Sequence, residues 1–286
     1  MGETKKPLIQ QGWLRALLYL LLGLSATFAL VLIIALASNS SMQNLLKQPT
    51  GTKDFLFTYC INNTGFILVA FLMRVLVDRK SFYSLGFQWK GFASDAFTGF
   101  FIAVLILCIG SLLLMALKLV YFTGFSFNPM HLAGTAALFI IVAFIEEIIF
   151  RGYLLNNLMQ SMNKYAALAI SALVFALFHA ANPDISILSI ANLIIAGVLL
   201  GINYIYTKNL WFAIFLHFAW NYFQGPVFGY QVSGFGTNGM LQQTLAGHTL
   251  WTGGNFGFEG SLLTPVLEFM AIVLLVKKYE KTIVSR

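Results

Sequence analysis

The stretch IEEIIFRGY (residues 145–153) places three ionisable side chains inside a long apolar run that begins near Ala133. Charged groups are costly to bury in hydrocarbon, so residues of this kind usually have a function. On a helix, Glu147 and Arg151 lie four residues apart on one face and can form an ion pair. Glu146 points about 100° away from that pair. The spacing predicts that Arg151 holds Glu147, and it leaves Glu146 as the residue whose purpose must be explained.

The composition of the chain places it in a membrane. It has 286 residues, of which 59% are hydrophobic and 9% are charged, and its mean hydropathy is +0.81. Apolar runs of 18 residues or more indicate bilayer spans. The net charge of +7 does not indicate a nucleic-acid partner, because the basic residues are scattered over loop ends. A lipid bilayer explains them better.

The apolar runs predict an all-α fold, a polytopic bundle of about eight transmembrane helices. The last of the eight runs is the weakest, since it is short and contains Glu268. We divide the chain into three regions: N-terminal helices (1–129), a core with the polar motifs (130–225), and a Gly-rich loop with a final helix (226–286). The expected spans are 13–37, 55–77, 97–120, 133–155, 165–181, 185–206, 209–223 and 262–276.

The distribution of basic residues predicts the orientation. If the N-terminus is cytoplasmic, only Lys47, Lys53 and Lys118 of the 17 basic residues fall toward the outside, which leaves 14 toward the inside. Cytoplasmic loops carry the excess of Lys and Arg in membrane proteins. We therefore expect a multi-pass protein of the cell membrane with both termini in the cytoplasm. The loop of residues 224–261, which has no Lys or Arg, would then be outside. It could be a lid that contacts substrate or an irregular surface loop.

Three polar constellations stand on the later apolar runs. The first contains Glu146, and the second is Phe175 with His179 near the end of the fifth run. The third is His217 with Asn221, four residues apart on one face of the seventh run. Polar side chains in hydrocarbon need polar partners, and one shared cavity would serve all of them. At about 1.5 Å per residue, they reach the middle to outer-middle layer of a core about 30 Å thick.

Two kinds of chemistry fit these residue types. A glutamate and a histidine can together deprotonate water, and a second histidine with an asparagine can stabilise an oxyanion. This combination would hydrolyse a peptide bond inside the membrane. Alternatively, Glu146, His179 and His217 could bind zinc, with water as the fourth ligand. The residue types allow both, and the sequence does not choose between them.

The order and spacing of the three motifs are similar to those of a known family. EExxxR (146–151), FxxxH (175–179) and HxxxN (217–221) resemble the CPBP family, which comprises CAAX-processing and bacteriocin-processing intramembrane proteases and is also called the Abi family. The resemblance covers roughly residues 130–225. The segment GGNFGFEG (253–260) is similar to one that is common in bacterial members.

The resemblance implies an activity and a role for each motif residue. Glu146 would activate water with the help of His179, and His217 and Asn221 would stabilise the oxyanion or add polar contacts. Glu147, Arg151 and Phe175 would support them. The family includes proteins described as metalloproteases, but a mechanism without a cofactor is favoured here. The expected partner is a membrane peptide or protein that serves as substrate.

Two other function classes fit a buried polar pocket. The first is a non-enzymatic protein of bacteriocin self-immunity or a membrane scaffold that binds a peptide. The second is a transporter, in which buried Glu and His relay protons. No inverted repeat or pair of broken helices supports transport. A protein that only binds has no need of a general base, so the four residues Glu146, His179, His217 and Asn221 favour the enzyme.

Overall fold

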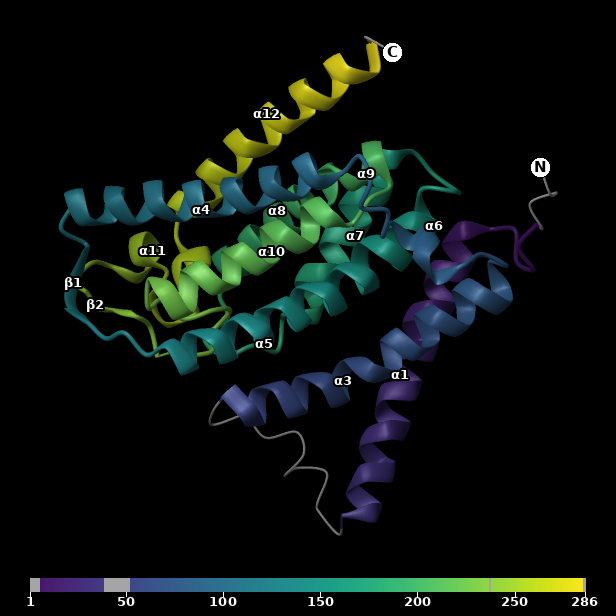
Figure 1. Ribbon diagram of the computed structural model, residues 1–286, viewed down its shortest axis with the longest axis horizontal. Coiled ribbons are helices and arrows are strands. Elements are labelled where there is room, and N and C mark those ends of the chain that lie inside the picture. The colour runs from purple at the N-terminus through teal and green to yellow at the C-terminus, as the bar shows by residue number, and fades with distance from the viewer. Residues whose placement is uncertain (1–5, 39–51, 237, 285–286) are drawn as a thin grey trace.

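The protein is a bundle of helices with one small sheet, as seen in a computed structural model that describes residues 6–38, 52–236 and 238–284 (Figure 1). The predicted helical membrane bundle is therefore confirmed. The helices are α1 (Gly12–Ala37), α3 (Thr52–Leu72), α4 (Ala93–Ala116), α5 (Pro129–Glu147), α6 (Asn156–Leu158), α7 (Lys164–Phe178), α8 (Ile187–Ile202), α9 (Tyr204–Thr207), α10 (Trp211–Tyr222), α11 (Thr249–Thr252) and α12 (Leu263–Val284). The strands are β1 (Val120–Phe125) and β2 (Leu241–Leu245).

Fewer helices than the predicted eight are long and apolar enough to cross a membrane. Within the described residues, five segments meet both conditions, and α7 is an apolar helix of shorter length. α10 has 12 residues and is covered on several sides by other helices, and α12 contains Glu268 and several lysines. The count of eight spans is thus not confirmed. The five are Gly12–Ala37, Phe55–Val77, Ala93–Ala116, Pro129–Leu158 and Ile187–Thr207.

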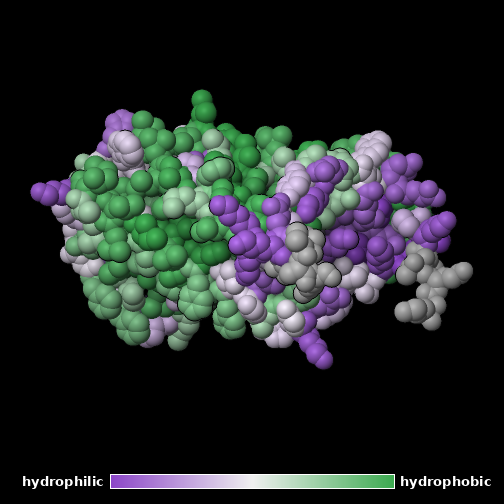
Figure 2. Space-filling view, turned by 90° about the horizontal axis from the view of Figure 1, so that it is seen from above, coloured by the Kyte–Doolittle hydropathy of each residue, from purple (hydrophilic) through white to green (hydrophobic). Residues whose placement is uncertain are grey.

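The hydrophobic surface agrees with a membrane location. Figure 2 shows hydrophobic side chains over a broad part of one face, whereas hydrophilic side chains gather toward the end where Figure 1 places the N-terminus. Many large apolar side chains are exposed on the outer helices, including Phe101 on α4 and Phe269 on α12. In water such a surface would be unfavourable, and in lipid it needs no cover. The chain is a multi-pass membrane protein.

α1 and α3 form an arm that leans away from the main bundle (Figure 1). A buried ion cluster joins the two helices of this arm: Arg15 of α1 and Arg74, just after α3, donate to opposite oxygens of Asp78 at 2.7 Å and 3.0 Å. Arg15 also donates to Gln160 at 2.7 Å, next to α6. Two residues that the charge count assigns to the cytoplasmic side are thus structural ion-pair partners. Lys47, counted on the other side, does not fall within the described residues.

A two-stranded antiparallel sheet closes the end of the bundle away from the N-terminus, and an all-α fold does not predict it. β1 follows α4, and β2 belongs to the long loop after α10. Val120 pairs with Leu245 and Phe125 with Leu241, with a bulge between Phe122 and Gly124. The sheet fixes part of the 224–261 loop, which also includes α11 and is not irregular throughout.

Candidate functional site

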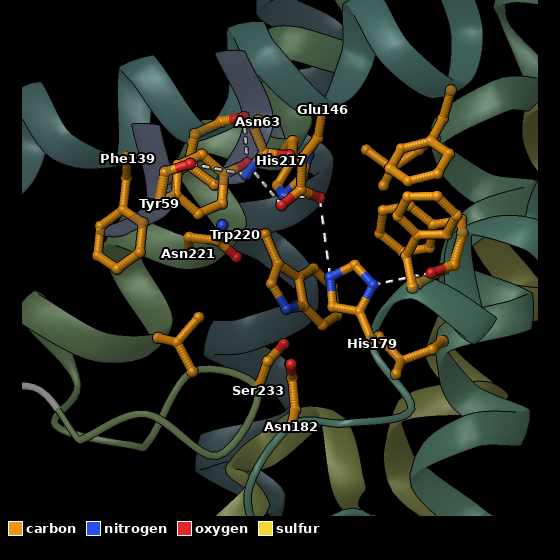
Figure 3. Close-up of a pocket in the computed structure, with 18 of the residues that line it drawn as sticks. Tyr59, Asn63, Phe139, Glu146, His179, Asn182, His217, Trp220, Asn221 and Ser233 are labelled. Atoms are coloured by element: carbon orange, nitrogen blue, oxygen red, sulfur yellow. Dashed lines mark hydrogen bonds and ion pairs between the residues drawn. The ribbon is translucent and has the colours of Figure 1, made fainter. Parts of the chain in front are cut away.

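The three polar constellations meet at one cavity, as the sequence predicts. The cavity has a volume of about 410 Å³, and its walls include Glu146, His179, His217 and Asn221. They come from the end of α5, the residue after α7, and successive turns of α10. Figure 3 shows Glu146 above His179, with Trp220 and Asn221 beside them. Helices far apart in the sequence therefore bring these side chains together.

Glu146 is the residue on which the others converge. Its Oε2 atom lies 3.7 Å from Nε2 of His179 and 3.9 Å from Nε2 of His217. Its Oε1 atom accepts a hydrogen bond of 2.8 Å from the hydroxyl of Tyr59 on α3. Oε2 has no hydrogen-bond partner among the described residues, although the atom is buried. A carboxylate oxygen that faces two imidazole rings without direct contact leaves room for a small reactant.

Each histidine is oriented by a bond on the far side of its ring. Nδ1 of His179 lies 2.8 Å from the carbonyl oxygen of Phe175, and Nδ1 of His217 lies 2.8 Å from Oε1 of Glu147. A carbonyl and a carboxylate can only accept, so both Nδ1 atoms carry a proton. The Nε2 atoms are therefore the ones presented to Glu146. This arrangement fixes the tautomer as well as the direction of each ring.

Glu147 has two partners, one more than the sequence predicts. Arg151 donates to its Oε1 at 3.0 Å, which confirms the expected ion pair. The same oxygen faces Nδ1 of His217 on α10. Glu147 and Arg151 are 0% and 1% exposed, so the pair is sheltered from solvent. Glu147 thus connects the arginine to a residue of the cavity wall.

The chain changes from α-helix to π-helix directly after the two glutamates. Residues Ile148–Leu155 are π-helical, and Arg151 lies in this segment. π-helical turns are rare and frequently occur at functional sites. Arg151 also donates to the carbonyl of Gly197 at 3.0 Å and lies 4.7 Å from the ring centre of Phe175. A Cβ at Gly197 would crowd Ala172 of α7, so glycine permits the close approach of α7 and α8.

Phe175 supports both parts of the site. Its ring centre lies 4.5 Å from that of His179 and 6.3 Å from that of His217. The Phe175 ring also contacts the guanidinium of Arg151, as described above. The sequence identifies Phe175 only as part of a motif, whereas the structure shows the three neighbours that it packs between. This ring separates the buried arginine from the cavity.

The sequence gives no reason to include Tyr59 or the residues of the loop after α10. Tyr59 lies on a different apolar run, and its register relative to Glu146 depends on how α3 packs. Val232, Ser233, Phe235 and Glu259 of the 224–261 loop also line the cavity. The loop therefore forms a wall of the cavity.

The alternative of a zinc site depends on which donor atoms face the cavity. The Nε2 atoms of His179 and His217 and the Glu146 carboxylate are suitable zinc donors, and the outward Nδ1 bonds are typical of zinc-ligating histidines. However, among the described residues no group of three His, Cys, Asp or Glu side chains is arranged to hold a metal ion. The donor atoms thus suit zinc although they are not gathered around a metal position, and no chemical step below depends on a metal.

Comparison with known proteins supports the resemblance noted from the motifs. Residues 128–223 match the family described as type II CAAX prenyl endopeptidase Rce1-like. No curated protein and no solved structure gives a significant match. The matched region contains Glu146, His179, His217 and Asn221, with the arm of α1 and α3 and the final helix outside it. The match over this region supports a CPBP family intramembrane protease, as the three motifs suggest.

Proposed function

We propose that the protein is an intramembrane endopeptidase that hydrolyses peptide bonds of a membrane-associated peptide or protein. The observation that carries this proposal is the position of Glu146 in the cavity. Its unpartnered oxygen faces the Nε2 atoms of two histidines at 3.7 Å and 3.9 Å. A binding pocket for apolar peptide has no need of this arrangement, whereas the activation of water does.

In the proposed reaction, Glu146 acts as the general base. Its carboxylate takes a proton from a water molecule held between Glu146 and His179, and the water oxygen attacks the substrate carbonyl carbon. The resulting tetrahedral oxyanion collapses and breaks the bond to nitrogen. The proton on Glu146 passes to the leaving amine, so that both products are released and the carboxylate is restored. Tyr59 keeps Glu146 in position through its hydrogen bond to the other oxygen.

His217 and Asn221 are proposed to stabilise the oxyanion. They lie one turn apart on α10, on the wall of the cavity that contains Glu146. The Asn221 side-chain amide can donate directly. His217 can donate from Nε2 only when it carries protons on both ring nitrogens, and the Glu147 carboxylate at Nδ1 stabilises that charged form. With Glu146, Glu147 and Arg151 ionised, protonation of His217 makes the group of four electrically neutral.

The proposal is tested by identifying the peptide that is cleaved. Cells that contain the wild-type protein and cells that contain the Glu146→Ala variant are compared by membrane proteomics. A hydrolase predicts that at least one membrane peptide remains uncleaved only with the variant. Identical cleavage patterns in the two cell types, with both proteins present in the membrane, would contradict the proposal.

A further inference from the structure

Two further glutamates line the cavity and are not used by the proposed reaction. Glu259 lies in the loop after α11 and Glu268 on α12, and both belong to the wall of the cavity that contains Glu146. They are 8% and 1% exposed. Glu259 belongs to the GGNFGFEG segment, whose purpose the motif alone does not explain. The structure thus places the GGNFGFEG segment at the wall of the cavity.

The glycines of this segment are required by its path. Gly257 has φ +100°, and a Cβ there would overlap the carbonyl oxygen of Gln231. The side-chain nitrogen of Asn192 on α8 donates to the carbonyls of Glu259 and Ser261 at 2.8 Å and 2.9 Å. The Glu259 carboxylate accepts hydrogen bonds from the backbone N–H and from the hydroxyl of Ser233. Glu259 is therefore held firmly at the cavity wall.

Glu268 provides an independent observation. Its Oε2 atom is buried and has no hydrogen-bond partner among the described residues. An unpaired carboxylate oxygen in an apolar surrounding is unfavourable, and a cation next to it removes much of that cost. Glu268 also lies close enough to Glu259 for the two carboxyl groups to interact electrostatically. Burial raises the pKa of the Glu259 carboxyl, while the Ser233 hydrogen bonds oppose that shift.

Among the described side chains that line the cavity, only the histidines can carry a positive charge, and His217 is already paired with Glu147. Among the described residues that line the cavity there is no lysine and no arginine, whereas there are three glutamates, Glu146, Glu259 and Glu268. Arg151 is fully buried behind Phe175 and engaged by Glu147. A ligand group with negative charge would thus meet only carboxylates and the histidines. A group with positive charge would instead supply a hydrogen-bond donor and a counter-charge to the unpaired oxygen of Glu268.

We propose that Glu259 and Glu268 form a subsite for a basic group of the substrate, the ammonium of a lysine or the guanidinium of an arginine. This inference rests on the proposed function, because it places a peptide in the cavity.

Binding of three small probes tests the subsite without any need for hydrolysis. The probes are 4-phenylbutylamine, 4-phenylbutanol and 4-phenylbutyrate, which share a ring and a chain but carry positive, zero and negative charge. Their dissociation constants are measured by calorimetric titration of the purified full-length protein in a neutral detergent. We expect the amine to bind about tenfold or more tightly than the alcohol, and the carboxylate to bind most weakly.

Variants locate the effect within the cavity. Glu259→Gln and Glu268→Gln should each remove most of the preference for the amine over the alcohol. Glu280→Gln, an exposed glutamate on the same helix α12, is the matched control and should keep it.

The outcomes separate this inference from the proposed function. Equal affinities for the three probes in the wild-type protein, or a preference that survives in both Glu259→Gln and Glu268→Gln, would overturn the subsite. If Glu146→Gln still abolishes cleavage in that case, the protease remains and only the subsite is wrong. A preference that depends on Glu259 and Glu268 would support the subsite even if no peptide is found to be cleaved. The ranking in the wild-type protein stands even if one variant fails to fold.

Discussion

Replacement of Glu147 by glutamine removes one charge from the most deeply buried ion pair of the site. The substitution keeps the size of the side chain and one acceptor oxygen. It leaves Arg151, which is 1% exposed, without a carboxylate. It also takes the carboxylate away from Nδ1 of His217. We expect two separate effects, a loss of stability through Arg151 and a loss of activity through His217.

The size of the first effect follows from the remaining contacts of Arg151. Breaking a buried ion pair costs about 3–5 kcal/mol when one charge stays behind. Arg151 retains the carbonyl of Gly197 and the face of the Phe175 ring. Because these contacts still stabilise the buried guanidinium, we expect the free energy of unfolding to fall by the lower value of this range, about 3 kcal/mol. A double variant, Glu147→Gln with Arg151→Met, removes both charges and should recover most of that loss.

The free energy of unfolding is measured by titration with sodium dodecyl sulfate in mixed micelles, and peptide cleavage is measured on the same preparations. Both variants should be inactive, because in both His217 has no carboxylate at Nδ1. Stability restored in the double variant without activity would separate the two effects. A Glu147→Gln protein that is within about 1 kcal/mol of wild type, well below the expected cost, would refute the reasoning. So would a double variant less stable than the single one.

Three further predictions concern the metal, Tyr59 and access to the cavity. Chelators should leave cleavage unchanged and the purified protein should hold well under one zinc per chain; stoichiometric zinc that is lost and restored together with activity would instead favour the site of Glu146 and the two histidines. Tyr59→Phe should lower the cleavage rate about tenfold with little loss of stability, since Glu146 loses the donor that orients it; an unchanged rate would contradict this role. Ser233→Cys, on a background without Cys60 and Cys108, should react with a membrane-impermeant thiol reagent in intact cells, because the 224–261 loop is predicted to be outside. Reaction only in inverted vesicles would reverse that orientation.

Local spacing was sufficient for the parts of the site that lie on single helices. The pair of Glu147 and Arg151 follows from a separation of four residues, and so does the shared face of His217 and Asn221. The meeting of the three constellations was also predictable, because isolated polar groups in hydrocarbon need partners. The helical membrane bundle follows from composition alone.

Contacts between distant segments could not be predicted in this way. Nothing in the residues around Tyr59 indicates that its hydroxyl reaches Glu146, since that depends on how α3 packs against α5. The second partner of Glu147 depends in the same way on the packing of α10 against α5. The charge count places Arg15 and Arg74 toward the cytoplasmic side, but it does not indicate that both pair with Asp78 inside the protein. Hydropathy could not separate spanning helices from short helices such as α10, which other helices cover.

The central claim is that Glu146 activates the water that cleaves the substrate. The most direct measurement is the single-turnover rate of cleavage of the peptide found by proteomics, with purified wild-type, Glu146→Gln and Glu280→Gln proteins whose melting temperatures are compared. A general base predicts that Glu146→Gln is slower by about 10²–10⁴-fold at an unchanged melting temperature, while Glu280→Gln cleaves as the wild type does. Cleavage by Glu146→Gln at the wild-type rate would contradict the account.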